Sequence, residues 1–564
     1  MSLAPEARFR LGWHHVLLAL GLYAVFTTSL GVVLHFTPIP LNDQWDGTIG
    51  FYLRAQQAPY DAWFEQHNEH RLIFSRLLFY LDLGYLRGRN VSLLAANLFL
   101  AALVAATMLR IATRHCALSR AQRIGLAGGI LAFIFSWMQE ENFTWGFQSQ
   151  WFAVCLFALW AFESIQMSAQ HVRARRSWRA WGWLLAALAC AIGAACSMAS
   201  GLLVVAIVAV LATHHQLGWT KIVVVIAGGI VVWSLYLRHW HPVAANGSGI
   251  GAVLQHPLGI VQFVLLYLGA PGMHTLLGRA GAFVWGLFVA GTTLVQVIRS
   301  LRLRGTKAIA LLAFSGFILG TALSTALGRL SFGLDSALAS RYTTASLSCA
   351  PALAIYTWMN ARSIWVRRTA TIASIAMLTV VAVFQHRALQ ANPDEAFARK
   401  VGGLALRAHV YDGNVTGPLY PFEDRLVPTA QAAEAARLSI FSPAQTDFYD
   451  APPRISAGSR CEGHIDRVWQ TRTPGVYGAS GWIYDPASRR VPGDLVVVSP
   501  DGRMLGTGVS GGKRDDVATI HGNGSRHSAW TAFFTAPPQS VFEVAGRVGN
   551  DVFCSTAGAA GRTP

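Results

Sequence analysis

The stretch LGWHHVLLALGLYAVFTTSLGVVLHF, Leu11–Phe36, decides the fold class of this chain. It is longer than the roughly 20 apolar residues that cross a bilayer as a helix. It is also too long for a cleaved signal peptide and lacks a small-x-small cleavage site, so we expect a retained membrane helix. The composition agrees, because 53% of the 564 residues are hydrophobic, only 13% are charged and the mean hydropathy is +0.39.

Similar apolar stretches recur along the chain and predict a mostly α-helical, polytopic membrane protein with about eleven spans. Besides the first, these stretches are Val91–Thr113, Ile124–Met138, Trp151–Met167, Ala180–Cys196, Gly201–Thr213, Lys221–Leu237, Ala280–Val297, Ile309–Leu327, Thr344–Met359 and Thr369–Phe384. Two other segments, Pro257–Gly272 and Leu72–Leu86, are expected to be half-inserted or juxtamembrane helices. If either crossed the bilayer, the basic loops after it would change sides.

Basic residues gather in alternate loops that hold no acidic residue between them. They are Arg8, Arg10, Arg114, Arg120, Arg123, Arg173, Arg175, Arg176, Arg179, Arg299, Arg302, Arg304, Lys307, Arg362, Arg367 and Arg368. The positive-inside rule then predicts a cytoplasmic N-terminus and an extracytoplasmic C-terminal tail. The Arg-rich, Lys-poor usage fits a GC-rich bacterium, so the expected location is a bacterial inner membrane. The net charge of +17 therefore reflects topology and does not call for a nucleic-acid partner.

The tail is expected to form two parts after a membrane region that covers residues 1–386. Residues 387–454 carry helix-start signals and predict a helical juxtamembrane linker. Residues 455–564 predict an extracytoplasmic β-sandwich of roughly 100 residues, with a hairpin turn at Asp501-Gly502. Cys461 and Cys554 bracket this region, which favours a disulfide between its first and last strands, with two free thiols as the alternative.

The loops on the predicted outer side hold an unusual concentration of acidic, basic and aromatic residues. A carboxylate beside cationic groups at a membrane boundary is what deprotonation of a hydroxyl near a lipid-linked phosphate requires. Four motifs carry these residues, namely NDQWD (Asn42–Asp46) and HNEHR (His67–Arg71) in the outer loop 37–90, ENFTWGFQ (Glu141–Gln148), and SRYT (Ser340–Thr343).

This architecture and these motifs resemble the GT-C superfamily of polytopic membrane glycosyltransferases over residues 1–386. The resemblance implies an inverting transfer of a sugar from a polyprenyl-phosphate donor to a glycan or lipid acceptor of the cell envelope. It also implies a catalytic base in the first outer loop, for which Asp43 is our first choice and Asp46 the second. The alternative for Asp43 is a cap on the following helical turn.

The resemblance also suggests roles for the other outer-loop residues. Donor phosphate binding is assigned to His70, Arg71, Arg329, Arg341 and Tyr342, since a guanidinium fork suits phosphate oxygens. Arg71 could instead snorkel to the interface. Acceptor binding or site lining is assigned to Glu69, Glu140, Glu141, Trp145 and Gln148, although an interfacial aromatic belt also explains Trp145. We expect no required cofactor, and a divalent metal on one of the two adjacent glutamates remains the alternative.

Two other classes of protein compete with the enzyme hypothesis. In a transporter or lipid flippase, the polar residues would line a path through the membrane. The chain has no evident internal repeat, and its charges cluster at predicted helix ends, so we favour the enzyme. The third possibility is a non-catalytic envelope assembly protein that displays the β domain.

Overall fold

The structure, a computed structural model, describes residues 12–242, 255–303, 306–443, 454–549, 552–556 and 560–564. Arg8, Arg10 and Arg304, which support the predicted orientation, lie outside these residues. The chain divides into two compact units. The first comprises Met1–Leu34, Trp63–Leu78 and Leu93–Gln390, and the second comprises His35–Ala62, Phe79–Ser92 and Ala391–Pro564.

The first unit is helical, and the predicted multi-pass membrane protein is confirmed. Among the described residues, 10 helical segments are long and apolar enough to cross a membrane. They are Trp13–Leu34, Val91–His115, Arg120–Thr144, Gly146–Arg173, Ser177–Ala195, Trp219–Leu237, Pro257–His274, Arg279–Arg302, Ile309–Phe332 and Ile364–Leu389.

Three segments differ from the expected set of spans. The helix α10 (Gly201–His214) is apolar but shorter than a span, and α16 (Ser340–Asn360) is not among the candidates by composition. The stretch SRYTTASLSC makes α16 too polar, yet most of its residues are buried within the unit. Pro257–His274 meets the criteria for a span, but its α-helical part, α13 (Pro257–Gly269), would extend only about 20 Å.

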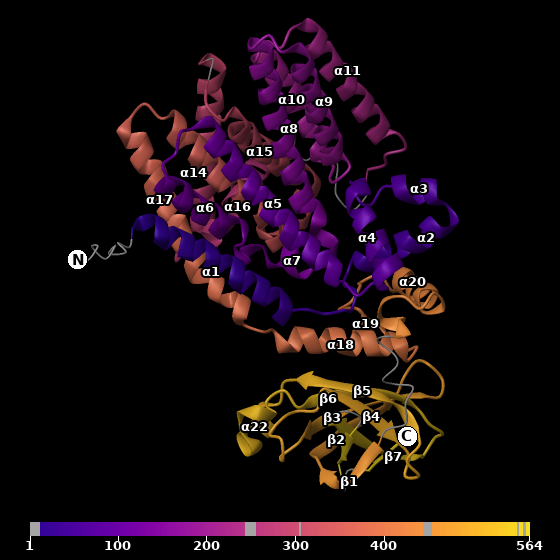
Figure 1. The fold of residues 1–564 in the computed structure, drawn as a ribbon. Coiled ribbons are helices and arrows are strands. Elements are labelled where there is room, and N and C mark those ends of the chain that lie inside the picture. The colour runs from indigo at the N-terminus through magenta and orange to yellow at the C-terminus, as the bar shows by residue number, and fades with distance from the viewer. Residues whose placement is uncertain (1–11, 243–254, 304–305, 444–453, 550–551, 557–559) are drawn as a thin grey trace, which may run out of the picture. The chain divides into compact units, whose positions relative to one another are not determined.

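The remaining helices of the first unit complete a bundle around α8 (Ser149–Arg173), which is buried along most of its length (Figure 1). The others are α1 (Trp13–Leu34), α5 (Val91–His115), α6 (Arg120–Ile134), η2 (Trp137–Gln139), α7 (Glu140–Thr144), η3 (Gly146–Gln148), α9 (Ser177–Ala195), α11 (Trp219–Leu237), η5 (Ala270–His274), α14 (Arg279–Arg302), α15 (Ile309–Arg329), η6 (Leu330–Phe332), η7 (Leu334–Leu338), α17 (Ile364–Phe384) and η8 (Gln385–Leu389). Two further helices, α3 (Pro59–Phe64) and α4 (Ile73–Leu86), are divided between the two units, and the first two residues of α5 also belong to the second unit.

Small residues let some of these helices approach closely. A Cβ at Gly128 of α6 would lie 2.2 Å from the Leu17 carbonyl oxygen of α1. A Cβ at Gly269, where α13 ends, would lie 1.8 Å from the carbonyl oxygen of Ala282 in α14. Both positions exclude any larger residue, as is usual where membrane helices pack by van der Waals contact without a hydrophobic driving force between them.

The second unit combines short helices with a β domain. Its helices are η1 (Gln44–Gly50), α2 (Phe51–Gln57), α18 (Pro393–Arg407), α19 (Gly413–Thr416), α20 (Glu423–Ala435), η9 (Ser439–Phe441), α22 (Asp515–His521) and η10 (Asn523–Ser525). The predicted helix starts after His386 are confirmed at Asn392, whose side chain caps α18 by accepting a hydrogen bond from Glu395 N. A hydrophobic cluster that includes Trp45, Leu83 and Leu419 joins the early segments of this unit to the helices that follow α18.

The predicted β domain is confirmed, but its strands form one continuous, mostly antiparallel sheet and not the two packed sheets of the expected β-sandwich. The strand order is β1-β8-β7-β4-β5-β6-β3-β2, with β9 pairing with β7. The strands are β1 (Arg454–Arg460), β2 (Glu462–Gln470), β3 (Val476–Tyr484), β4 (Asp494–Val498), β5 (Met504–Gly512), β6 (Ala529–Thr535), β7 (Val541–Arg547), β8 (Val552–Ser555) and β9 (Gly561–Arg562). The expected hairpin joins β4 to β5, with Gly502 at a φ of +83°.

This sheet curls into a half-barrel, because its two edge strands are consecutive in the chain. Only Cys461 separates β1 from β2, and its amide donates to the carbonyl oxygen of Ser555 in β8 at 3.0 Å. The concave side encloses an apolar core that includes Tyr477, Trp530 and Phe542. The helix α18 covers part of the opposite face, where Phe397 packs near Phe533 (Figure 1).

The predicted disulfide is present. Cys461 and Cys554 are bonded, with their Cα atoms 5.3 Å apart and a sequence separation of 93. The remaining cysteines, Cys116, Cys155, Cys190, Cys196 and Cys349, are free thiols. The disulfide links the junction of β1 and β2 covalently to β8, near the place where the two edge strands of the sheet follow each other in the chain.

We expect loss of the disulfide to weaken the β domain. Closing a loop of this length restricts the unfolded chain, so Cys554→Ala should lower the free energy of unfolding by about 2–5 kcal/mol. Thermal unfolding of the purified full chain checks this. As a control, maleimide labelling of the denatured wild type should count five thiols before reduction and seven after it. Seven thiols before reduction would contradict the bridge.

Candidate functional site

Most of the predicted site residues of the first unit lie at one end of its helical bundle. The carboxyl ends of α11 and α15 and the amino ends of α8 and α16 meet the segment 65–72 and the short helices η2, α7 and η3 at this end. Gln385, at the carboxyl end of α17, donates to the Thr28 hydroxyl of α1 at 2.8 Å and accepts from Trp137 N at 2.9 Å. Of the acidic side chains predicted for the site, Glu69, Glu140 and Glu141 lie at this end of the first unit, whereas Asp43 and Asp46 belong to the second unit.

The motif HNEHR forms a tight turn that presents Glu69. His67 and His70 exchange two backbone hydrogen bonds of 2.8 and 2.9 Å, and Asn68 takes a left-handed φ of +49°, which asparagine tolerates. The Glu69 carboxylate at this turn pairs with the Arg329 guanidinium at 3.0 Å. Both side chains keep part of their surface exposed, so this pair of a predicted lining residue and a predicted phosphate ligand is accessible.

The structure favours a structural role for Arg71 and His70. The Arg71 guanidinium donates to the carbonyl oxygens of Tyr236 (2.8 Å), Phe64 and Arg238. The His70 ring nitrogen Nδ1 accepts a hydrogen bond from Ala199 N at 3.2 Å. Arg71 therefore ties the segment before α4 to the end of α11, and this matches neither the phosphate contact nor the interfacial snorkelling considered from sequence.

Glu141 and Arg341 form a second ion pair at the start of α16. Their side chains lie 3.6 Å apart, and the Glu141 carboxylate also accepts the backbone N–H of Arg341 at 2.9 Å. A carboxylate at a helix N-terminus satisfies an unpaired amide and complements the helix dipole. Asn142 adds to this contact by donating to the Arg341 carbonyl oxygen at 2.8 Å. This pair joins α7 to α16.

The other predicted lining residues differ in exposure. Tyr342 is buried, and its ring packs between those of Trp151 and Tyr267 at centroid distances of 5.5 and 5.4 Å. Gln148 is buried and accepts a hydrogen bond from Gln150 at 3.1 Å. Trp145 is half-buried beside Phe147, whereas the Glu140 side chain is exposed. Only Trp145 and Glu140 of this group offer surface to a ligand.

Asp43 and Asp46, the predicted catalytic pair, lie in the second unit around a π-helix. The segment QWDGTIG folds as η1, a seven-residue π-helix that starts directly after Asp43. Asp43 makes no side-chain capping hydrogen bond, so the alternative role as a helix cap is wrong. π-Helical turns are rare and occur often at functional sites, because they re-aim side chains.

Two arginines flank Asp46. Its carboxylate lies 3.3 Å from the Arg54 guanidinium of α2 and 3.9 Å from that of Arg425 in α20. Burial, followed by the negative charge of Asp46, raises the pKa of the nearby Tyr420 phenol. Asp46 therefore holds two partly exposed cations next to the π-helix.

A chain of buried polar groups holds this segment in place. Gln44 of η1 donates to the Asn90 side-chain oxygen at 3.1 Å, and Asn90 N donates to the Asp82 carboxylate at 3.4 Å. The Asp82 carboxylate also accepts a hydrogen bond from the Ser92 hydroxyl. Burial raises the pKa of Asp82, and its hydrogen bonds from Ser92 and Asn90 only partly oppose this shift. Asn42 N, on the other side, donates to the Leu419 carbonyl oxygen at 2.6 Å.

Sequence reasoning missed Arg54, Arg425 and Asn142 as parts of these arrangements. Arg54 lies eight residues after Asp46, close to the helical spacing that would have placed it near. Arg425 is almost 400 residues away from Asp46 in a segment read as a linker, and no local signal connects them. Among the residues that the structure describes, no three His, Cys, Asp or Glu side chains are grouped as metal ligands.

Comparisons with protein-family models, with curated proteins and with solved structures found no match for this chain.

The role of Arg71 can be tested through stability. Arg71→Ala removes the donors to three carbonyl oxygens, and since each hydrogen bond to a charged group contributes about 1.5–3 kcal/mol, we expect a loss of at least about 2 kcal/mol. Arg238→Ala is the matched control, because it keeps the backbone oxygen that Arg71 contacts. Thermal unfolding in detergent compares the two variants. Equal midpoints would exclude the structural role.

Asp82 makes stability depend on pH. Because its pKa is raised in the folded protein, the folded state holds the proton over a range in which the unfolded state has lost it. Stability from this group is complete below the ordinary aspartate pKa and declines as the pH rises toward the raised value. Asp82→Asn should not show this decline. As the pH is raised from 4, the unfolding midpoint of the wild type should therefore fall relative to that of Asp82→Asn. A difference between the two midpoints that stays constant with pH would contradict the assignment.

Proposed function

We propose that this protein is an inverting membrane glycosyltransferase that uses a polyprenyl-phosphate sugar donor and a glycan or lipid acceptor of the cell envelope. The observation that carries the proposal is the π-helix η1, which places Asp43 beside a carboxylate, Asp46, that organises two arginines. A base next to fixed cations is the arrangement that activation of a hydroxyl near an anionic leaving group needs.

In this proposal Asp43 removes the proton from the acceptor hydroxyl. The hydroxyl oxygen attacks the anomeric carbon of the donor, the bond from that carbon to the phosphate oxygen breaks, and polyprenyl phosphate leaves with the electron pair. A single displacement inverts the configuration at the anomeric carbon. Asp46 is the second candidate for the base, since its carboxylate already forms ion pairs with Arg54 and Arg425.

Arg54 and Arg425 are our first choice for the leaving phosphate. Their side chains are 44% and 61% exposed, so each has surface available in addition to its contact with Asp46. Guanidinium groups bind phosphate oxygens through paired N–H donors. Among the residues predicted from sequence for this role, Arg329 and Arg341 each pair with a glutamate within the helical unit. Arg71 is not one, because backbone carbonyl oxygens occupy its donors.

The proposed orientation has the N-terminus in the cytoplasm and the β domain outside, in a bacterial inner membrane. The basic loops support it through the positive-inside rule. The Cys461–Cys554 bond supports it independently, because structural disulfides persist in extracytoplasmic compartments. On this orientation the end of the helical unit that carries the HNEHR turn faces outward.

A transporter or flippase is the second candidate, and one observation favours it. Glu163 of α8 is a buried carboxylate inside the helical unit, 3.1 Å from His115 of α5. Intramembrane ionisable pairs are common in transport paths. His115 and Arg114, which lies 3.9 Å from Glu163, are in the last turn of α5, and this contact with a basic helix end suits a structural pair.

Substitution of the two aspartates tests the proposal. Asp43→Asn should lower transfer at least about 100-fold, since removing a general base has an effect of this order. Its unfolding midpoint is measured in parallel, so that a loss of transfer caused by unfolding is recognised. Asp46→Asn should lower transfer less, by about tenfold, because it removes only the ion pairs that orient Arg54 and Arg425. The assay follows a labelled hexose from undecaprenyl phosphate into an envelope glycolipid extract, with purified full-length chain.

Asp61→Asn is the matched control, because Asp61 is an exposed aspartate in the same loop segment. It should keep wild-type transfer. Wild-type transfer by Asp43→Asn would exclude Asp43 as the base. If the wild-type chain transfers no sugar but moves the labelled lipid across vesicles, the flippase is the correct class.

A further inference from the structure

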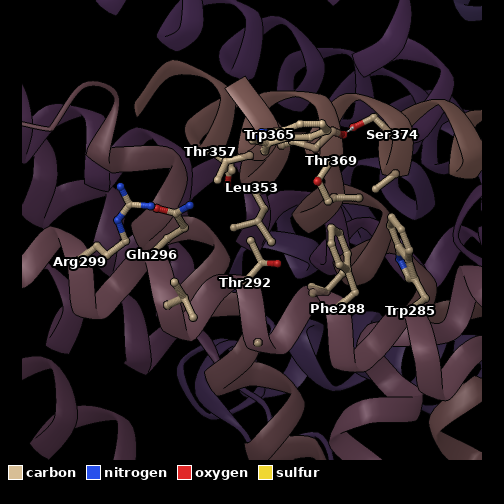
Figure 2. A pocket seen from close by; sticks show the side chains of 18 of the residues that line it. Trp285, Phe288, Thr292, Gln296, Arg299, Leu353, Thr357, Trp365, Thr369 and Ser374 are labelled. Carbon is tan, nitrogen blue, oxygen red and sulfur yellow. Dashed lines mark hydrogen bonds between the residues drawn. The ribbon is translucent and has the colours of Figure 1, made fainter. Parts of the chain in front are cut away.

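A groove of about 400 Å³ follows α14 in the helical unit, with α16 as its floor and α17 as its far wall. Figure 2 shows Trp285 and Phe288 at one end and Gln296 and Arg299 at the other, with Thr292 between them. From Trp285 to Arg299 the groove runs about 21 Å along the helix. This volume lies within the range of ligand sites in proteins.

The groove opens toward the surroundings of the helical unit. Val295 of α14 and Trp365 of α17 both line it, and they are 54% and 70% exposed. The neighbouring side chains Leu294 and Ile298 are also exposed and apolar. Because α14 and α17 are both candidate membrane spans, these exposed faces contact lipid, and lipid is what can enter the groove.

The two ends of the groove differ in polarity. Phe288 and Trp285 make one end apolar, while Gln296, Arg299 and Thr357 make the other polar. The sequence around the polar end, over residues 296–307 and 357–369, contains Arg and Lys but no Asp or Glu. Arg368 lies over the Trp365 ring at 5.3 Å, and an arginine next to an interfacial tryptophan is typical of lipid headgroup depth.

We infer that this groove binds one anionic glycerophospholipid, with the phosphate on Arg299 and an acyl chain along Thr292 and Leu353 toward Phe288. The length supports an acyl chain, because half of a bilayer core of about 30 Å matches one chain and the remaining groove accommodates the headgroup. The charge supports an anionic headgroup. The inference is independent of the proposed transferase, because none of these residues takes part in it.

Native mass spectrometry of the detergent-purified full chain tests the site, with phosphatidylglycerol and phosphatidylcholine as the probes. The wild type should retain one phosphatidylglycerol more strongly than phosphatidylcholine. Arg299→Gln should reduce retention of phosphatidylglycerol about fivefold, since an arginine near an anionic lipid contributes about 1 kcal/mol. Arg299→Lys should keep the preference. Arg302→Gln is the matched control, because Arg302 is an exposed arginine on the same helix that does not line the groove.

A tail-blocking variant makes the test independent of Arg299. Ala373 lines the groove on α17, so Ala373→Phe should reduce retention of both lipids by the same factor. Wild-type retention by Arg299→Gln or by Ala373→Phe would overturn the site. Stronger retention of undecaprenyl phosphate than of phosphatidylglycerol would overturn the choice of lipid, and a lipid-free dimer would assign the groove to a second copy of the chain. Should Arg299→Gln fail to fold, Ala373→Phe alone decides.

Discussion

Backbone amide and carbonyl groups find no water inside a bilayer, and the helical unit depends on that constraint. Its long helices satisfy their own backbone, and the irregular segments between them occur at helix ends. Polar side chains complete the hydrogen bonds there. Gln385 contacts α1 and η2, Asn142 contacts α16, and Arg71 contacts three carbonyl oxygens. These residues could be mistaken for a catalytic set because they are polar and clustered.

The predicted site residues differ in whether their side chains are used in hydrogen bonds to the backbone. Glu141 satisfies the amide at the start of α16, and Arg71 holds a loop. Asp43 makes no side-chain capping hydrogen bond, and it precedes a π-helix whose hydrogen-bond register departs from that of an α-helix. An irregular helix is less stable than an α-helix, so its persistence requires support from elsewhere. The buried chain from Gln44 through Asn90 to Asp82 supplies that support.

The second unit assembles from distant parts of the chain. The segments 35–62 and 79–92 pack with residues beyond 390, where Leu419 accepts from Asn42 and Arg425 approaches Asp46. The helices read from sequence as a linker therefore form part of the support for the predicted catalytic segment. The β domain follows from them, since α18 packs directly on its sheet.

Sequence patterns alone were enough to predict the membrane class, most of the helices, the β domain, its β4–β5 hairpin and the pairing of Cys461 with Cys554. These depend on apolar length, local turn chemistry and the bracketing of one domain by two cysteines, all of which a linear pattern records. Three features came only from the folded chain: α16 is a buried polar helix, the segment after Asp43 is π-helical, and Arg425 approaches Asp46. Such contacts join residues hundreds of positions apart, and only packing and the need to satisfy buried polar groups select them.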